Sequence, residues 1–231
     1  MISRISLLLP TRERPQALRE LYESAMNLAD HPEQIELVVY IDNDDNSYED
    51  YNPPRLKKIG GERKTISKCW NDCWRAATGE IFNHCGDDLR YRTKGWDTIV
   101  RQEFEKYPDR IVFLYGDDGM TELNGYEFGT HGFIHKNWTD VIGRFVPDYY
   151  ESDYNDTHLN DVAGALGRHV HIPIMTEHMH HSIGKSEMDQ NTRDRLERHE
   201  RQHPGEVYNA RFQRVERKDE VERLRVFIDE Y

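Results

Sequence analysis

The stretch Ile81-Phe82-Asn83-His84-Cys85-Gly86-Asp87-Asp88 joins a short apolar run to two aspartates through a single glycine. A buried strand that ends in Gly-Asp-Asp places two carboxylates at the carboxyl edge of a sheet, where α/β proteins bind their ligands. Carboxylate oxygens are also the ligands that hard divalent cations prefer. Taken alone, the same residues would fit a solvated turn, because Asp and Gly are common turn residues. The elements around this stretch decide between the two interpretations.

Patterns typical of strands and helices alternate on both sides of this stretch. We expect strands at residues 5–9, 35–41, 81–85 and 111–115, and helices at residues 15–28, 65–77 and 95–104. Residues 47–61, which contain two prolines and two glycines, have the composition of a loop. The repeated order of strand, helix and strand predicts an α/β fold with a mainly parallel central sheet flanked by helices, of Rossmann-like type.

The second half of the chain is less regular. Its pattern predicts short strands at residues 132–135 and 170–175, and helices at residues 137–143 and 156–166. From Lys185 onward charged residues dominate, so we expect a charged helical C-terminal tail, packed on the domain or on a second copy; a solvated, partly disordered tail is the alternative. The predicted organisation is a domain over residues 1–184, with a donor-binding half (1–100) and an acceptor half (101–184), and a helical extension over residues 185–231.

Composition narrows the class of protein. The chain has 231 residues and a net charge of −12, which argues against a broad nucleic-acid footprint but leaves room for a local basic channel. Its three cysteines, Cys69, Cys73 and Cys85, match no zinc-binding spacing, so we expect reduced core residues. No run approaches the length of a membrane span, and the apolar run 5–9 is too short for a signal peptide. We therefore expect a cytoplasmic protein.

Polar loops follow three of the predicted strands, at residues 10–14, 42–45 and 87–88. Because the carboxyl ends of parallel strands share one edge, these loops should converge. A ligand with a hydrogen-bonding ring and a diphosphate would use all three, with Asp42 at the base or ribose, Arg12 or Arg14 near the phosphates, and a cation on Asp87 or Asp88. The glycine-rich dinucleotide and Walker A motifs are missing, which counts against dinucleotide oxidoreductases and P-loop enzymes.

A set of residues matched in order over about the first hundred positions resembles the nucleotide-binding half of inverting glycosyltransferases of the A-type fold, the family-2-like nucleotide-sugar transferases. The residues that carry this resemblance are Leu7-Leu8-Leu9-Pro10-Thr11-Arg12-x-Arg14-Pro15, Asp42, Arg63, Asn71, Ala76, Gly79-Glu80-Ile81 and Gly86-Asp87-Asp88.

The resemblance assigns expected roles to these residues. It implies that Thr11 and Asp42 hold the nucleoside, and that Asp88 binds Mn²⁺ or Mg²⁺ on the donor diphosphate. The other nucleotide-sugar-binding candidates are Pro10, Arg12, Arg14, Arg63 and Asp87. The spaced acidic pair of the family is replaced here by adjacent aspartates, so the sequence leaves open which carboxylate is the main metal ligand.

The second half offers a candidate base. The stretch Asn155-Asp156-Thr157-His158-Leu159 resembles the family motif at the start of a helix, with asparagine where the family usually has glutamate, and it makes Asp156 the residue that would deprotonate the acceptor hydroxyl. A carboxylate at a helix N-terminus is held by backbone N–H groups and can be aimed at a substrate. A capping role for Asp156 is the alternative, and Asp153 could share the work.

Imidazoles are concentrated in Glu177-His178-Met179-His180-His181. The alternation of His178 and His180 on an extended segment would point both rings to one face, as metal ligation requires. By the resemblance a late histidine completes the cation site, with His180 as the first candidate and His178 as the second. Lys185 would contact the diphosphate. Two further stretches are weaker. Asp117-Asp118 fits a turn better than the alternative, a contact to the sugar or the acceptor. Gly129-Thr130-His131-Gly132 would line the acceptor side.

The sequence thus predicts a metal-dependent, hexosyltransferase-like enzyme that moves a sugar from a nucleotide-diphosphate donor, expected to be a UDP-sugar, to a hydroxyl acceptor with inversion. The acceptor would be a glycan or, for an enzyme of viral origin acting in the host cytoplasm, a hydroxymethylated base in DNA contacted by the basic residues of 55–68. A homodimer through the C-terminal tail is a further expectation. The alternatives are a metal-dependent phosphate or ester hydrolase and a noncatalytic nucleotide-sugar-binding protein.

Overall fold

A computed structural model describes residues 3–120, 127–151 and 153–231. The strands are β1 (Ile5–Pro10), β2 (Ile35–Asp42), β3 (Leu56–Gly61), β4 (Ile81–His84), β5 (Leu89–Tyr91), β6 (Phe113–Asp117), β7 (Phe133–His135) and β8 (His169–His178). The helices are α1 (Pro15–Leu28), α2 (Ile66–Ala76), α3 (Trp96–Glu105), α5 (Lys136–Ile142), α6 (Asn155–Leu166), α7 (Gln190–Gln202), α8 (Pro204–Asn209) and α9 (Arg211–Glu230), with short 3₁₀ turns η1 (Pro32–Gln34) and η2 (His181–Ile183).

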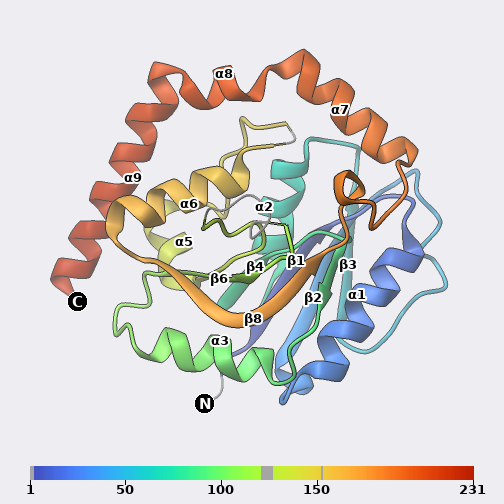
Figure 1. Ribbon diagram of the computed structural model, residues 1–231, viewed down its shortest axis with the longest axis horizontal. Helices are drawn as coiled ribbons and strands as arrows, with labels where there is room; N and C mark the ends of the chain where they lie inside the picture. The colour runs from blue at the N-terminus through green and yellow to red at the C-terminus, as the bar shows by residue number, and fades with distance from the viewer. Residues whose placement is uncertain (1–2, 121–126, 152) are drawn as a thin grey trace.

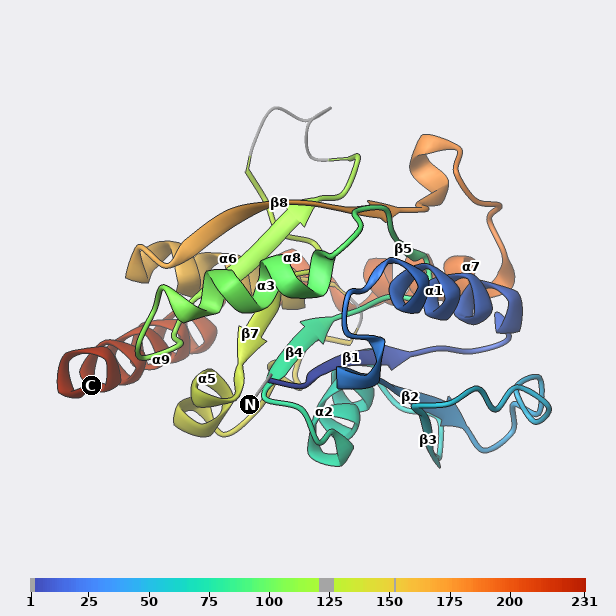
Figure 2. The same ribbon diagram turned by 90° about the horizontal axis from the view of Figure 1, so that it is seen from below.

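In the described part of the chain the strands form one eight-stranded sheet in the order β3-β2-β1-β4-β7-β6-β8-β5 (Figures 1 and 2). Strands β3, β2, β1 and β4 are parallel to one another, whereas β7 runs antiparallel to both β4 and β6. Strand β8 is parallel to β6, and β5 pairs antiparallel with β8 at the edge. The predicted α/β fold with a mainly parallel sheet flanked by helices is confirmed.

Helices cover both faces of the sheet, which explains why β1 reads as an unbroken apolar run. On one face Leu7 and Leu9 of β1 pack in a cluster with residues of α1 and α3. Leu8 points to the other face and packs with residues of α2, α5 and α6. All three leucines are fully buried, and each contributes about 1.5–3 kcal/mol by the apolar surface it removes from water. The three cysteines are free and buried, as expected.

Two expectations about local structure are corrected. Residues 47–61 are not a loop throughout, because residues 56–61 form the parallel edge strand β3. Its glycines serve close packing, since a Cβ at Gly61 would collide with the hydroxyl of Tyr40. Strand β6 starts later than predicted and continues through Gly116, where a Cβ would collide with the backbone of Ile174 in β8. Gly116 and Asp117 are therefore strand residues and not a turn.

The C-terminal tail is helical, as predicted, and its helices α7, α8 and α9 run as an arc around the outside of the domain (Figure 1). Helix α9 is attached by the buried Leu224 and by Glu220, which accepts hydrogen bonds from Arg144 and from Nε2 of the buried His158 at 2.6 and 2.7 Å. No helix that the structure describes has the length and apolar character needed to cross a membrane.

Candidate functional site

The loop after β1 is held by one of the two adjacent aspartates. Asp87 is buried and accepts hydrogen bonds from Thr11 Oγ1 at 2.7 Å and from Arg14 Nη1 at 3.0 Å, one on each carboxylate oxygen. Tyr48 adds to this arrangement, because its hydroxyl lies 2.8 Å from Thr11 Oγ1 and accepts from the backbone N–H of Arg14. Asp87 therefore anchors the β1 loop to the end of β4.

The other aspartate faces the end of β8. Nε2 of His178 donates to Asp88 Oδ2 at 3.1 Å. Burial alone would raise the pKa of Asp88, but the hydrogen bond and charge of His178 outweigh burial and hold this pKa well below its usual value. Burial would lower the pKa of His178, but the hydrogen bond and charge of Asp88 raise it. The carboxylates of Asp118 and Asp156 act on His178 in the same direction.

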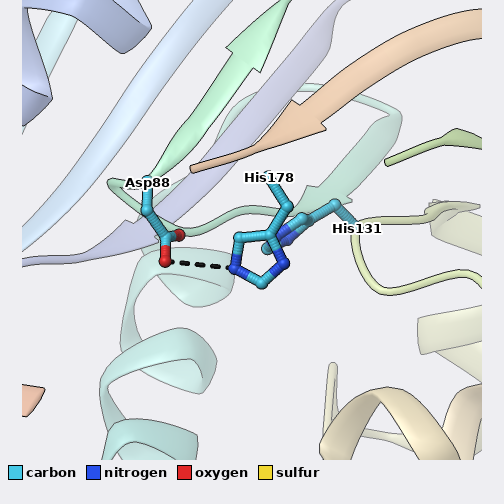
Figure 3. Close-up of side chains that lie close together, drawn as sticks. All are labelled: Asp88, His131 and His178. Carbon is cyan, nitrogen blue, oxygen red and sulfur yellow. Dashed lines mark hydrogen bonds and ion pairs between the residues drawn. The ribbon is translucent and has the colours of Figure 1, made fainter. Parts of the chain in front are cut away.

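A second histidine completes the group. His131 comes from the loop before β7, is 7 % exposed, and its ring centroid lies 4.8 Å from that of His178 in an edge-on arrangement. One ligand atom each from Asp88, His131 and His178 lie within 4.8 Å of one another. Figure 3 shows the three side chains pointing toward a common region, with the hydrogen bond between Asp88 and His178 dashed.

Gly86 makes room for this group. A Cβ at this position would lie 2.7 Å from Asp88 Oδ1 and 3.3 Å from Cε1 of His131. The first contact is closer than packed atoms allow, so any side chain here would displace the Asp88 carboxylate. The glycine between the strand and the two aspartates is therefore required by space and not by an unusual φ.

The donor set of this group fits a divalent cation. Nε2 of His178 and Oδ2 of Asp88 are 3.1 Å apart, close to the ~3 Å that separates neighbouring ligands around an ion with bonds of about 2.1 Å at right angles. Nε2 of His131 is buried and has no hydrogen-bond partner among the described residues. A carboxylate and two imidazoles are ligands that divalent transition metals accept.

The end of β2 carries the second polar cluster. Arg12 binds Asp42 through Nη1 at 2.9 Å and holds Asp44 with both terminal nitrogens at 2.5 and 2.9 Å. A pocket of about 270 Å³ opens beside this cluster. Its lining residues are Ile41, Asp42, Asn43, Asp45, Tyr48, Glu49, Lys58, Ile59 and Gly60. Pro10 ends β1 next to it, in register with Tyr40.

Asp156 lies in the first turn of α6, and Tyr154 rather than Asp156 occupies the capping position, with a left-handed φ of 76°. Burial, the largest influence, raises the pKa of Asp156 to about 6, although the backbone N–H of Thr157 donates to its Oδ1 at 2.8 Å. Asp153 is placed differently, because its two oxygens accept from Arg195 Nη1 and from His199 Nδ1 of α7, both at 2.7 Å.

Helix α7 also reaches the N-terminal part of the chain. Arg14 forks onto Asp189, the residue that caps α7, with nitrogen–oxygen distances of 2.6 and 2.7 Å. Arg63 Nη2 donates to Asp194 at 2.9 Å, and Asn191 donates to the carbonyl oxygen of Arg12 at 2.7 Å. One helix therefore contacts both the β1 loop and the segment before α6.

Asp88, His131 and His178 are called the metal-ligand group below. Two other expected site residues, His180 and Lys185, make local bonds. Nδ1 of His180 lies 2.7 Å from Ser182 Oγ and accepts the N–H of Ser182, so it caps η2, while its ring centroid is 5.0 Å from that of His178. Nζ of Lys185 donates to Glu177 at 2.7 Å and lies near Gly119 in the loop after β6.

Sequence reasoning did not place His131 or Asp118 beside Asp88 and His178. The signal for His131 was its place in the glycine-flanked stretch 129–132, which was expected to line the acceptor side. Asp118 is 2 % exposed and accepts from Thr130 Oγ1 at 2.7 Å and from the N–H of Met120, so it supports the same loop. Only the fold brings residues 118 and 131 to the ends of β4 and β8.

Comparison with known proteins supports the fold. No family model matches the sequence, and no curated protein matches it either. The structure is similar to that of the mannosyltransferase PcManGT from Pyrobaculum calidifontis, determined in complex with GDP-Man and Mn²⁺, with a TM-score of 0.66 and 15% sequence identity over 98% of this chain and 70% of the other. It is also similar to S. aureus TarS 1–349, with a TM-score of 0.52 and 14% identity, covering 75% of this chain and 57% of the other. The chain therefore has the A-type fold of the glycosyltransferases over nearly its whole length.

Proposed function

We propose that the protein is a metal-dependent glycosyltransferase that moves a sugar from a nucleotide-diphosphate donor to a hydroxyl group with inversion. The observation that carries this proposal is the convergence of three groups at one edge of the sheet. They are the Asp42 cluster with its pocket, the metal-ligand group around Asp88, and a carboxyl group, Asp156, whose pKa is raised to about 6. Together these provide a nucleoside site, a diphosphate site and a base.

Asp156 performs the proton transfer in this proposal. Its carboxylate takes the proton of the acceptor hydroxyl as that oxygen bonds to the anomeric carbon, and the bond from this carbon to the donor phosphate breaks on the opposite side. A base with a pKa near the working pH is partly deprotonated and still strong enough to accept a proton. The proton then passes from Asp156 to water, and the nucleoside diphosphate departs.

A cation on Asp88 and His178 would neutralise the charge that develops on the departing diphosphate. Arg14, in the loop after β1, is already paired with Asp87 and Asp189, so a phosphate would bind it by displacing Asp189. At the nucleoside end, Asp42 lines the pocket beside β2 and would accept a hydrogen bond from the base or ribose. Thr11 holds the loop after β1 to Asp87.

A UDP-sugar is the first candidate donor, and GDP-mannose, the donor present in the PcManGT structure, is its direct competitor. The acceptor candidates are a glycan and a hydroxymethylated base in DNA. Release of nucleoside diphosphate that depends on one of these acceptors would identify it, whereas equal release with water alone would favour a hydrolase.

The decisive experiment is a thermal-shift and calorimetric panel of nucleoside diphosphates and nucleotide sugars, with and without Mn²⁺. A ligand present at 100 times its Kd should stabilise the fold by about 2.7 kcal/mol. We expect stabilisation by one nucleoside diphosphate that requires the metal ion and disappears in Asp88→Ala. The matched control is Asp140→Ala, which removes an exposed carboxylate from α5 outside the site. Absence of any nucleotide binding to a folded, metal-loaded protein would reject the proposal.

A homodimer through the C-terminal tail is a separate proposal. The large apolar side chains exposed on α9 and the following terminus are Phe212, Val215, Val226 and Tyr231. Sedimentation equilibrium of the wild type and of Phe212→Asp tests it, and a monomeric wild type at all concentrations would reject it.

A further inference from the structure

His131 presents a fixed lone pair to the metal-ligand group. Its Nδ1 lies 3.0 Å from the carbonyl oxygen of His84, and a carbonyl only accepts, so Nδ1 carries the hydrogen. In the neutral ring the other nitrogen, Nε2, then has a free lone pair. This atom is buried and has no hydrogen-bond partner in the part of the chain that the structure describes. A backbone carbonyl that fixes the tautomer of a histidine is the usual support of a metal-binding imidazole.

The loop that carries His131 is fastened on both sides before any ligand arrives. Asn83 Nδ2 donates to the carbonyl oxygens of His131 and Gly132 at 3.1 and 3.0 Å, and Thr130 Oγ1 donates to Asp118. Asn160 holds Gly129 through two hydrogen bonds of 2.8 and 2.9 Å. These bonds fix the backbone that carries His131, and the hydrogen bond from Nδ1 to the carbonyl oxygen of His84 fixes its ring, so the fold sets the position of the imidazole.

The donor set differs from one that suits Mg²⁺. Magnesium prefers six oxygen ligands and keeps several waters, whereas imidazole nitrogen suits divalent transition metals such as Zn²⁺, Cu²⁺, Fe²⁺ and Ni²⁺. Two of the three protein ligands here would be nitrogen, from His131 and His178, and one would be the carboxylate of Asp88. Because three protein ligands are in place before the donor binds, the ion does not need phosphate oxygens to hold it. An ion coordinated mostly by water would need them.

We infer that Asp88, His131 and His178 together bind a divalent transition-metal ion from the protein side alone, before the donor, and discriminate against Mg²⁺. The inference rests on the proposed function for the role of the ion, but metal binding itself is measured without any donor. His131 is thus a metal ligand, and the remaining coordination positions stay open for oxygen atoms of a diphosphate. The ion would replace the proton that now lies between His178 and Asp88.

The test is calorimetry of the full-length protein with Mn²⁺, Co²⁺, Zn²⁺ and Mg²⁺, in the absence of nucleotide. We expect saturable one-site binding of the transition metals, and Mg²⁺ binding weaker by at least about 100-fold. His131→Gln should weaken Mn²⁺ binding by more than the 10–100-fold that loss of a supporting residue costs. The matched control is His171→Ala, which removes a half-exposed histidine from the same strand as His178 and should leave Mn²⁺ affinity unchanged.

A second measurement avoids dependence on a variant that fails to fold. Pulsed electron paramagnetic resonance of the wild-type protein loaded with Mn²⁺ should detect the nitrogens of two imidazoles. One imidazole, equal affinity for Mg²⁺ and Mn²⁺, or Mn²⁺ binding only after a nucleoside diphosphate is added would each overturn the inference. If the ion binds as described but no nucleotide binds, the inference stands and the proposed function fails. If the ion binds only together with a nucleotide, the inference fails and the proposed function stands.

Discussion

His178 stands opposite Leu89 in the ladder between β8 and β5, and this places its ring 3.1 Å from the carboxylate of Asp88, the residue just before Leu89. The backbone continues the pairing, because the N–H of Met179 donates to the carbonyl oxygen of Asp88 at 2.7 Å. The three-residue strand β5 therefore brings together two side chains that lie 90 positions apart in the sequence. The metal-ligand group depends on that short pairing.

Asp88→Ala should remove metal-dependent nucleotide binding and leave the fold intact. Its side chain is 29% exposed and its main partner is His178, so the loss in stability should be about 1 kcal/mol. Affinity for nucleotide with Mn²⁺ should fall by more than about 100-fold, because a charged ligand is lost in addition to a hydrogen bond. Titration calorimetry on a variant with native circular dichroism checks this, and wild-type affinity would contradict it.

Asp87→Asn should act mainly on stability. Both carboxylate oxygens of Asp87 are engaged, by Thr11 and Arg14, and the residue is buried. Hydrogen bonds to a charged group are worth about 1.5–3 kcal/mol, and Arg14 keeps Asp189 as a partner, so we expect a loss of about 2 kcal/mol in the free energy of unfolding. Urea unfolding of this variant beside Asp88→Ala gives the comparison. A larger loss for Asp88→Ala would reverse the roles assigned to the two aspartates.

Asp156→Asn should keep donor affinity and lose turnover by about 10²–10⁴-fold, since asparagine cannot accept the proton. The wild-type rate should also report the pKa of Asp156, which burial raises to about 6. A base works only when deprotonated, so the rate should rise with pH through about 6 and level off above it. Rate profiles of wild type and variant, measured with any working acceptor, check both statements. An unchanged rate in the variant would reject Asp156 as the base and make Asp153 or Asp118 the next candidate.

Asp97 should make stability depend on pH in the acid range. Its buried carboxylate accepts from the N–H groups of Asp30 and His31 and pairs with Arg101. Burial would raise the pKa of Asp97, but Arg101 and the two backbone donors lower it overall. A group whose pKa is lowered on folding stabilises above its unfolded pKa of about 3.9, and this contribution disappears as pH falls through the lower folded value.

The corresponding variant is Asp97→Asn, which leaves Arg101 buried without a counter-charge. We expect a loss of about 3 kcal/mol at pH 7. The difference from wild type should shrink as the pH is lowered from about 5 toward 3. Chemical unfolding at several pH values measures it, and a constant difference across this range would contradict the assignment.

The sequence predicted the elements whose signal is local. Leu7, Leu8 and Leu9 form an unbroken apolar run, which is typical of a strand covered on both faces, so β1 was predictable. The apolar residues Cys69, Trp70 and Cys73 repeat at helical spacing, so α2 was predictable too. The two adjacent aspartates are predicted site residues because they follow a buried strand; in the structure Asp88 lies with His131 and His178, and Asp87 anchors the loop after β1.

What the sequence did not predict depends on contacts between distant segments. Strand β5 has three residues and is defined by its pairing with β8, so it is too short to show a periodic pattern in the sequence. The glycines of β3 and β6 resembled turn signals, although they serve close approach to Tyr40 and Ile174. His131 lacked any spacing relative to Asp88 or His178 that would mark a ligand, because two loops and the end of β8 bring the three residues together. A histidine between glycines was its only local mark.

The hold of α7 on the β1 loop has a consequence for how salt would affect donor binding. Arg14 already carries two carboxylates, those of Asp87 and Asp189, and its Nη2, which donates to Asp189, also donates to Oγ1 of Thr192 in α7 at 2.9 Å. A phosphate that reaches Arg14 would therefore exchange places with Asp189 instead of neutralising an unpaired cation. In such an exchange salt screens the bond that breaks as well as the bond that forms, so affinity should respond weakly to ionic strength. The measured affinity would be the difference between the binding of phosphate and the binding of Asp189 to Arg14. The first turn of α7 would be released whenever phosphate displaces Asp189.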